Sequence, residues 1–332
     1  MIEARTATAE KDDAPVPQPM PPQAQELQPA PAHAPALLRA QANRLGILWM
    51  VVAMTAFIGN DALIKSIGQR VPTAQMIVVR GVMAIALIVL VAWRMGALPR
   101  IADTARGWVM LRAGCEGVGT FLYLAALMQL PLANATAINL SSPLFLAVLA
   151  VLLLRERVDR LRWIAIGAGF LGVLLVIQPR ADGFNASAWL CLLATLVYSL
   201  RDLLTRKIPA GTPSILVTLA TAGVVWLMAG GVLAVQGWQP MQWRDVGLLA
   251  LAAVFLSTGY HAVISATRHA EVSVVAPFRY TGLLWALILG YVVWGDIPNA
   301  LAWAGIALLL GAGLFMLHQQ RAIARRVLRQ RG

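Results

Sequence analysis

Apolar residues along this chain form long continuous runs, separated by short segments that are rich in charged residues and proline. A helix that crosses a lipid bilayer needs about 20 apolar residues, and runs of this length recur through most of the chain. The pattern therefore predicts an all-α integral membrane protein with ten transmembrane helices, at 46–67, 74–93, 107–129, 132–154, 161–178, 187–207, 213–235, 245–267, 272–294 and 299–318.

Composition supports the membrane interpretation and excludes several other classes. The chain is 59% hydrophobic and 13% charged, with a mean hydropathy of +0.71, which a soluble protein of 332 residues does not show. The net charge of +12 does not indicate a nucleic-acid-binding protein, because the basic residues lie between the apolar runs. The two cysteines and four histidines have no metal-ligand spacing, and there is no phosphate-binding glycine loop. We expect neither a metal nor a cofactor.

The distribution of lysine and arginine predicts the orientation in the membrane. With the N-terminus inside, seventeen of the loop and terminal Lys and Arg residues fall on the cytoplasmic side, and four fall on the other side: Lys65, Arg70, Arg180 and Arg244. Cytoplasmic loops carry an excess of these residues, so both termini are expected in the cytoplasm and the protein in the inner membrane. Residues 1–43, rich in proline and alanine, are predicted to be a disordered tail, and 319–332 a basic tail.

The two halves of the chain match each other at a nearly constant offset. Asp61 corresponds to Asp202 at a distance of 141 residues, and Gly119 to Gly259 at 140. The matches run through five spans, so we expect two copies of a five-helix unit, at 44–180 and 181–318. Because five is odd, the second copy inserts upside down. Inverted repeats with a central solute site are typical of secondary transporters.

Two segments resemble a known family. They are PLANATAINLSSPLFLAVLAVLLLRERV (131–158) and RHAEVSVVAPFRYTGLLWALILGYVVWGDIP (268–298). They are similar to the drug/metabolite transporter superfamily in its EamA-type, two-repeat form, and the resemblance covers about residues 44–318. The acidic residue that usually follows the fourth span of each repeat is kept as Glu156 and appears as Asp296 in the second repeat, and Arg155 stands where glycine is usual. The stretch around APFRYT is similar to a subgroup with transporters of cofactor-like metabolites.

Ionisable residues inside the expected spans are the candidate site residues, because such groups normally face the bundle interior or water. Three of them, Asp61, Arg80 and Asp202, are candidates for gating or ion coupling. Two structural alternatives remain open for them. Asp61 and Asp202 each precede a basic residue by four positions, which permits a pair on one helix face, and Asp61 also lies at the depth of Arg80, which permits a pair between spans.

The candidates for solute binding lie nearer the cytoplasmic side. Arg112 and Glu116 are four residues apart on one span, and Arg279 interrupts the ninth span. Burying an arginine at the centre of a membrane helix costs roughly 2.5–3.5 kcal/mol, so we expect a polar cavity, and an anionic group of the solute, to offset the charge of Arg279. In the alternative it pairs with Glu116 or extends to the interface. The other solute-binding candidates are Tyr198, Arg201, His261 and Tyr280, and His261 could also be a core or proton-coupling residue.

The leading hypothesis is a secondary transporter of a small organic metabolite, amino-acid-like or cofactor-like and with an anionic group, that works by alternating access. The alternatives are a flippase for a lipid or glycan-lipid, and a membrane receptor that transports nothing. An enzyme is not expected, because no catalytic set of residues is present. The expected partners are the metabolite and the lipid bilayer. The sequence is compatible with a homodimer, but it leaves the solute, the direction of transport and the coupling ion open.

Overall fold

The computed structural model describes residues 36–105, 107–154, 160–178, 186–205, 207–209, 211–270 and 272–331, and within these ranges it contains helices and no strands. The elements are α1 (Ala36–Ile67), α2 (Thr73–Arg94), η2 (Leu98–Ala105), α3 (Gly107–Gln129), α4 (Leu132–Asn139), α5 (Ser142–Leu154), α6 (Arg160–Ile177), α7 (Ala186–Thr205), α8 (Ser214–Gln236), α9 (Trp243–His269), α10 (Val272–Val275), η3 (Ala276–Tyr280), α11 (Thr281–Trp294) and α12 (Ala300–Arg331).

Seven segments of the described chain are long and apolar enough to cross a membrane, and two shorter apolar helices, Trp163–Ile177 and Ala300–Met316, accompany them. The outer surface of these helices carries large apolar side chains that no protein group covers, such as Leu152, Val235 and Val292. A surface of this kind is unfavourable in water and suits contact with lipid tails. The protein is therefore a multi-pass membrane protein.

The expected spans at 132–154 and 272–294 are each interrupted in the structure. The first divides into α4 and α5 around Leu140 and Ser141, and the second into α10, η3 and α11. At each interruption a hydroxyl side chain bonds the carbonyl three residues earlier: Ser141 Oγ donates to Ile138 at 2.5 Å, and Thr281 Oγ1 donates to Phe278 at 2.6 Å. These side-chain bonds compete with the helical backbone bonds. The two sites are 140 residues apart, so the interruption is a property of the repeat.

Two helix ends also differ from the expectation. The first helix begins at Ala36, ten residues before the expected start, and α12 continues to Arg331 through the segment that was assigned to the basic tail. Both extensions are rich in Ala, Leu, Gln and Arg, which are strong helix formers. Residues 1–35, the greater part of the expected N-terminal tail, lie outside the described residues.

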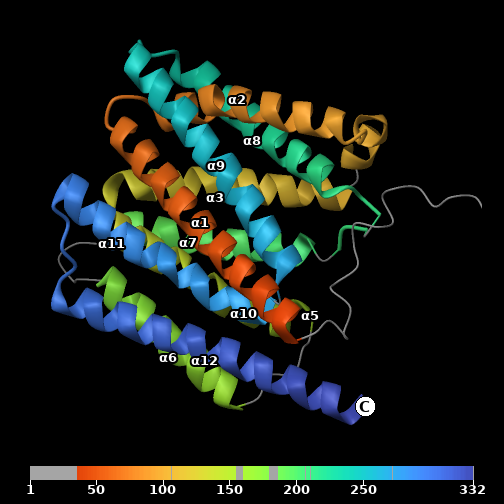
Figure 1. The fold of residues 1–332 in the computed structure, drawn as a ribbon. Coiled ribbons are helices and arrows are strands. Elements are labelled where there is room, and N and C mark those ends of the chain that lie inside the picture. Colours follow the sequence, from red (N-terminus) through yellow and green to blue (C-terminus); the bar gives the residue numbers. More distant parts are fainter. Residues whose placement is uncertain are drawn as a thin grey trace, which may run out of the picture.

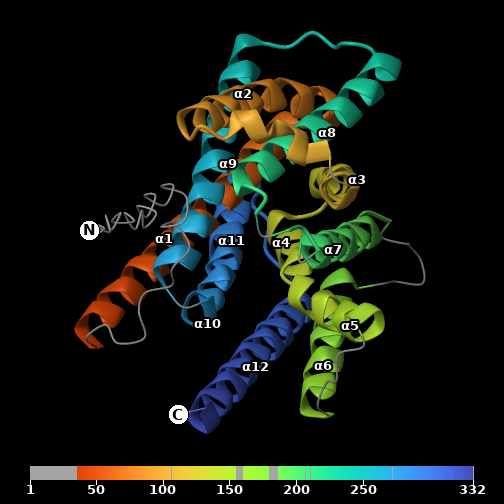
Figure 2. The same ribbon diagram turned by 90° about the vertical axis from the view of Figure 1, so that its right-hand side faces the viewer.

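Helices pack across the two halves of the chain in matching pairs. The longest contacts are those of α1 with α9 and of α3 with α7, while α2 packs on α8 and α6 on α12 (Figures 1 and 2). The 140-residue offset matches α1 with α7 and α3 with α9. Exchanging the two halves therefore converts the α1–α9 pair into the α3–α7 pair. The pairs α2–α8 and α6–α12 are converted into themselves. Contacts between halves therefore hold the bundle together.

A glycine lies against an aromatic ring at the centre of each long contact. A Cβ atom on Gly119 of α3 would lie 2.7 Å from the ring of Tyr198 on α7, and a Cβ atom on Gly259 of α9 would lie 2.7 Å from the ring of Phe57 on α1. No residue other than glycine fits at either position without a shift. The two contacts correspond under the repeat offset, and they set how closely the helices that carry the polar site approach each other.

Candidate functional site

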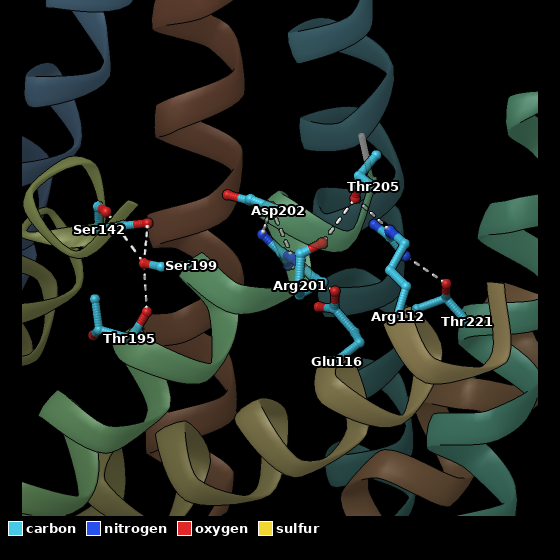
Figure 3. A network of polar contacts seen from close by, with 9 residues as sticks. All are labelled: Arg112, Glu116, Ser142, Thr195, Ser199, Arg201, Asp202, Thr205 and Thr221. Atoms are coloured by element: carbon cyan, nitrogen blue, oxygen red, sulfur yellow. Dashed lines mark hydrogen bonds and ion pairs between the residues drawn. The ribbon is translucent and has the colours of Figure 1, made fainter. Parts of the chain in front are cut away.

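An ion-pair network joins α3 of the first half to α7 of the second. Arg201 Nη1 donates to Glu116 Oε2 at 2.7 Å, and Arg201 Nη2 donates to Asp202 Oδ1 at 2.7 Å (Figure 3). The side chains of Glu116 and Arg201 are 11% and 20% exposed, whereas that of Asp202 is 41% exposed. The guanidinium also lies 5.0 Å from the centre of the Tyr198 ring, a cation–π contact. One arginine thus serves two carboxylates between the two halves.

Arg112 extends this network to a third helix. Its Nε donates to Thr205 Oγ1 on α7 at 3.0 Å and its Nη1 to Thr221 Oγ1 on α8 at 2.7 Å (Figure 3). The alternative that paired Glu116 with Arg279 is therefore wrong for this structure, because Glu116 pairs with Arg201. The two threonines were missed in the sequence because neither is ionisable.

A second polar cluster connects α1, α2 and α3. Arg80 Nη1 donates to Asn60 Oδ1 at 3.0 Å, and Asn60 Nδ2 donates to Asp61 Oδ1 at 2.9 Å. Tyr123 donates its hydroxyl to Asp61 Oδ2 at 2.7 Å. The direct pair of Asp61 with Arg80 that the spacing suggested is replaced by a link through Asn60. Asn60 was missed, although it occupies the position in the repeat that corresponds to Arg201.

The i,i+4 pair of Asp61 with Lys65 is also wrong. Lys65 is buried at 6% exposure and donates to the backbone carbonyl of Leu130, and its ammonium lies 5.3 Å from the centre of the Trp294 ring. The corresponding pair in the second half includes Arg206, which lies outside the described residues, as does Glu156. The described partner of Asp202 is the neighbouring Arg201.

Tyrosine rings connect the two clusters. The rings of Tyr123 and Tyr198 are 6.3 Å apart between centres, so the first cluster adjoins the ring on which Arg201 lies. Tyr260 of α9 packs edge-on against Phe57 at 5.3 Å and lies within electrostatic range of Glu116, Arg201 and Arg80. Its side chain is 45% exposed. Tyr260 was missed because a single tyrosine in a span has no distinctive spacing.

Three of the predicted site residues lie apart from these clusters. Arg279 and Tyr280 belong to η3, which packs on α1 and α12, and the Tyr280 hydroxyl lies against Gly313 of α12. Arg279 is exposed, and no hydrogen bond or ion pair connects it to another described residue. His261 is exposed on α9, with its ring edge-on to Trp49 at 5.9 Å and its Nε2 atom 3.5 Å from Ser265 Oγ. Within the described part of the chain, no three His, Cys, Asp or Glu side chains gather where a metal could bind.

Comparison with known proteins gives a consistent assignment. The model of the EamA-like transporter family matches residues 44–178 and again residues 185–318. The chain is 28% identical over 286 residues to a riboflavin transporter of Vibrio cholerae, with 85% of this chain and 95% of that protein covered. It is 24% identical over 278 residues to an S-adenosylmethionine uptake transporter of Rickettsia bellii, with 83% and 94% covered.

A solved crystal structure shares the fold. It superposes with a TM-score of 0.55 at 15% sequence identity and covers 87% of this chain and 99% of its own. The family model matches two segments that together span most of the chain, and the shared fold agrees with this match. The chain therefore belongs to the EamA-like transporter family, a family of the drug/metabolite transporter superfamily.

Proposed function

We propose that this protein is a secondary transporter that moves a small organic metabolite across the inner membrane by alternating access. In this proposal α3, α6 and α12 join the seven apolar segments to give ten spans, arranged as two inverted five-helix repeats at 44–180 and 181–318. The exchange symmetry of the helix pairs supports the inversion, and the lysine and arginine distribution supports cytoplasmic termini.

The observation that carries the proposal is the position of Arg201 between Glu116 and Asp202. The network crosses from the first repeat to the second, which is where transporters built from inverted repeats hold their solutes. An anionic group of the solute can take one of the two carboxylate places on Arg201, because a guanidinium accommodates carboxylate and phosphate groups with the same geometry. An amine of the solute can then bind the released Glu116. A solute that carries both an anionic group and an amine thus fits this site.

We assign gating or coupling to the cluster of Asp61, Asn60, Arg80 and Tyr123, with Asp202 as the counterpart of Asp61 in the other repeat. Asp61 accepts hydrogen bonds from two neutral donors and, among the described residues, forms no ion pair, so a proton or another cation can join it without breaking one. In the same proposal Arg279, Tyr280 and His261 contact the solute nearer the cytoplasm, along the path that η3 and α9 border.

Uptake by the full-length protein in proteoliposomes tests the transport proposal. The relatives named for riboflavin and S-adenosylmethionine make these the first solutes to examine, followed by a fractionated metabolite extract. We expect Glu116→Gln to reduce uptake about tenfold or more while expression stays normal, because the charge-assisted bond to Arg201 is lost. Arg44→Gln, at an exposed arginine of α1, is the control and should retain full uptake.

The opposite outcomes are equally specific. Equal uptake by Glu116→Gln and the wild type would show that the solute does not bind at this network. If the protein flips a fluorescent lipid and transports no soluble metabolite, it is a flippase and the proposed metabolite transport is wrong.

Cysteine labelling tests the orientation. In a protein whose Cys115 and Cys191 are replaced by alanine, Asn299→Cys should react with an impermeant maleimide on intact cells. Lys207→Cys should react only after the cells are opened. The reverse pattern would contradict cytoplasmic termini.

A further inference from the structure

A cavity of about 360 Å³ lies where α4 and α12 begin and α6 and α11 end. The loop that joins α11 to α12, at the left in Figure 1, supplies the lining residues 296–299. Its wall combines the apolar side chains of Val176 and Ile297 with the polar side chains of Asn134, Gln178, Asp296 and Asn299. None of these residues belongs to the two polar clusters described above. We call this cavity the α11–α12 pocket.

Two oxygen-bearing side chains of the pocket lack a partner. Asn134 Oδ1 is buried and accepts no hydrogen bond. The carboxylate of Asp296 is half-buried and, among the described residues, forms no ion pair or side-chain hydrogen bond. Buried polar atoms in folded proteins are nearly always hydrogen-bonded, so an exception of this kind calls for an explanation. Both groups are acceptors, and the ligand that would satisfy them is a hydrogen-bond donor.

The remaining polar side chains of the pocket form a frame that is already satisfied. Gln178 Nε2 donates to Asn299 Oδ1 at 2.6 Å, and Asn299 Nδ2 donates back to Gln178 Oε1 at 2.8 Å. Asn299 Oδ1 also accepts the backbone N–H of Ala302 at 2.9 Å, which caps the start of α12. Gln178 itself has a φ of 49°, a left-handed conformation that is unusual outside glycine. Strained residues of this kind cluster at binding sites.

Lys65 does not fill the pocket. Its ammonium is within electrostatic range of Asp296, but it donates to the carbonyl of Leu130 and lies over the Trp294 ring. Among the described residues that line the pocket there is no Lys or Arg. The wall of the pocket therefore holds one carboxylate without an ion pair among the described residues and one buried amide oxygen without a hydrogen bond, and a cationic N–H donor matches both.

We propose that the α11–α12 pocket binds a primary ammonium group. The ammonium has three donors, enough for Asp296 and Asn134 together, and the apolar part of the wall accommodates the carbon chain that carries it. Two sources share this chemistry: a small amine in solution and the ethanolamine headgroup of a lipid. The site does not depend on the solute site between α3 and α7, and its test does not require transport.

Binding of radiolabelled ethanolamine to the full-length protein in phosphatidylglycerol nanodiscs tests the site. We expect saturable binding by the wild type, and a dissociation constant raised about tenfold or more in Asp296→Asn, because the charge-assisted hydrogen bond is lost. Asn134→Leu should weaken binding as well, and the exposed Arg44→Gln should not. Ile297→Trp serves as a second variant, since residue 297 is 73% exposed and the larger side chain can fill the pocket without disturbing the core.

The proposal is overturned if the wild type shows no saturable binding, or if Asp296→Asn and Ile297→Trp bind ethanolamine as the wild type does. A further arm identifies the source. Adding phosphatidylethanolamine to the nanodiscs should displace labelled ethanolamine if the headgroup reaches the pocket, whereas an equal amount of phosphatidylcholine, which has no N–H, should not. Binding that is insensitive to both lipids assigns the pocket to a soluble amine.

Discussion

The contacts of Arg201 with both Glu116 and Asp202 allow the loss of stability in the variant Arg201→Met to be predicted. Methionine keeps an apolar side chain but is shorter, and it removes the cation that serves both Glu116 and Asp202 and lies over the Tyr198 ring. Glu116, whose side chain is 11% exposed beside Arg201, is then left without this partner. Breaking a buried ion pair by removing one member costs about 3–5 kcal/mol, because the other charge is left uncompensated. We expect a loss at the lower end of this range, since both side chains retain some access to solvent.

The exposures of the two carboxylates predict an order among the variants. Asp202 is 41% exposed, so Asp202→Asn should cost at most about 1 kcal/mol, as for a surface pair. Glu116→Gln keeps a hydrogen-bond acceptor and leaves Arg201 paired with Asp202, so its cost should also be about 1 kcal/mol. The double variant Glu116→Gln/Arg201→Met has no buried charge left and should be more stable than Arg201→Met alone.

Thermal unfolding of the purified protein in detergent, followed by tryptophan fluorescence, measures this order. One kcal/mol corresponds to about 2–4 °C for chains of 150–250 residues, so Arg201→Met should lower the midpoint by roughly 6–12 °C if it costs about 3 kcal/mol. Asp202→Asn should lower it by less than about 4 °C. Equal shifts for these two variants, or a double variant less stable than Arg201→Met, would refute the interpretation of Glu116 as a buried charge that depends on Arg201.

Two further predictions follow from the packing and from the second cluster. Gly119→Ala and Gly259→Ala should each lower the unfolding midpoint, because a Cβ atom at either position would lie 2.7 Å from an aromatic ring. Gly114→Ala is the matched control on α3, since its Cβ atom would have no neighbour within 4 Å. Tyr123→Phe should cost about 1.5–3 kcal/mol by removing the 2.7 Å hydrogen bond to the Asp61 carboxylate, and an unchanged midpoint in the same fluorescence assay would show that this bond contributes nothing.

Much of the fold could be predicted from the sequence because the bilayer imposes simple requirements. A spanning helix needs a long apolar run, and the chain has such runs with polar breaks between them. The repeat was visible in the offset that relates Gly119 to Gly259, and the structure places both glycines against an aromatic ring. The interruption at Ser141 was not predicted, because a short break of this kind depends on a local side-chain bond that leaves the apolar pattern unchanged.

The site residues could be selected from the sequence, but their pairing could not. An ionisable residue in a span must be satisfied inside the protein, which selected Glu116, Arg201 and Asp61 from the sequence. The partners, however, were sought at the i,i+4 spacing along single helices and between spans at a similar depth, and neither search gave the ion pairs that form. In the structure the strongest contacts run between helices, and Asn60 and Tyr123, which carry no charge at neutral pH, complete the second cluster.

The sequence by itself determined that the chain crosses a membrane, that its halves are related, and which few charged side chains must be accommodated within it. Each of these follows from the order of residues along the chain: from the length of an apolar run or from the spacing of a repeat. Tertiary structure alone decided that Arg201 meets Glu116 and that Lys65 donates to the backbone carbonyl of Leu130, in the connection between α3 and α4. These pairings depend on how packed helices are rotated and how closely they approach each other. Glycine–aromatic contacts between distant segments set that approach, and the spacing of residues along the chain does not reveal it.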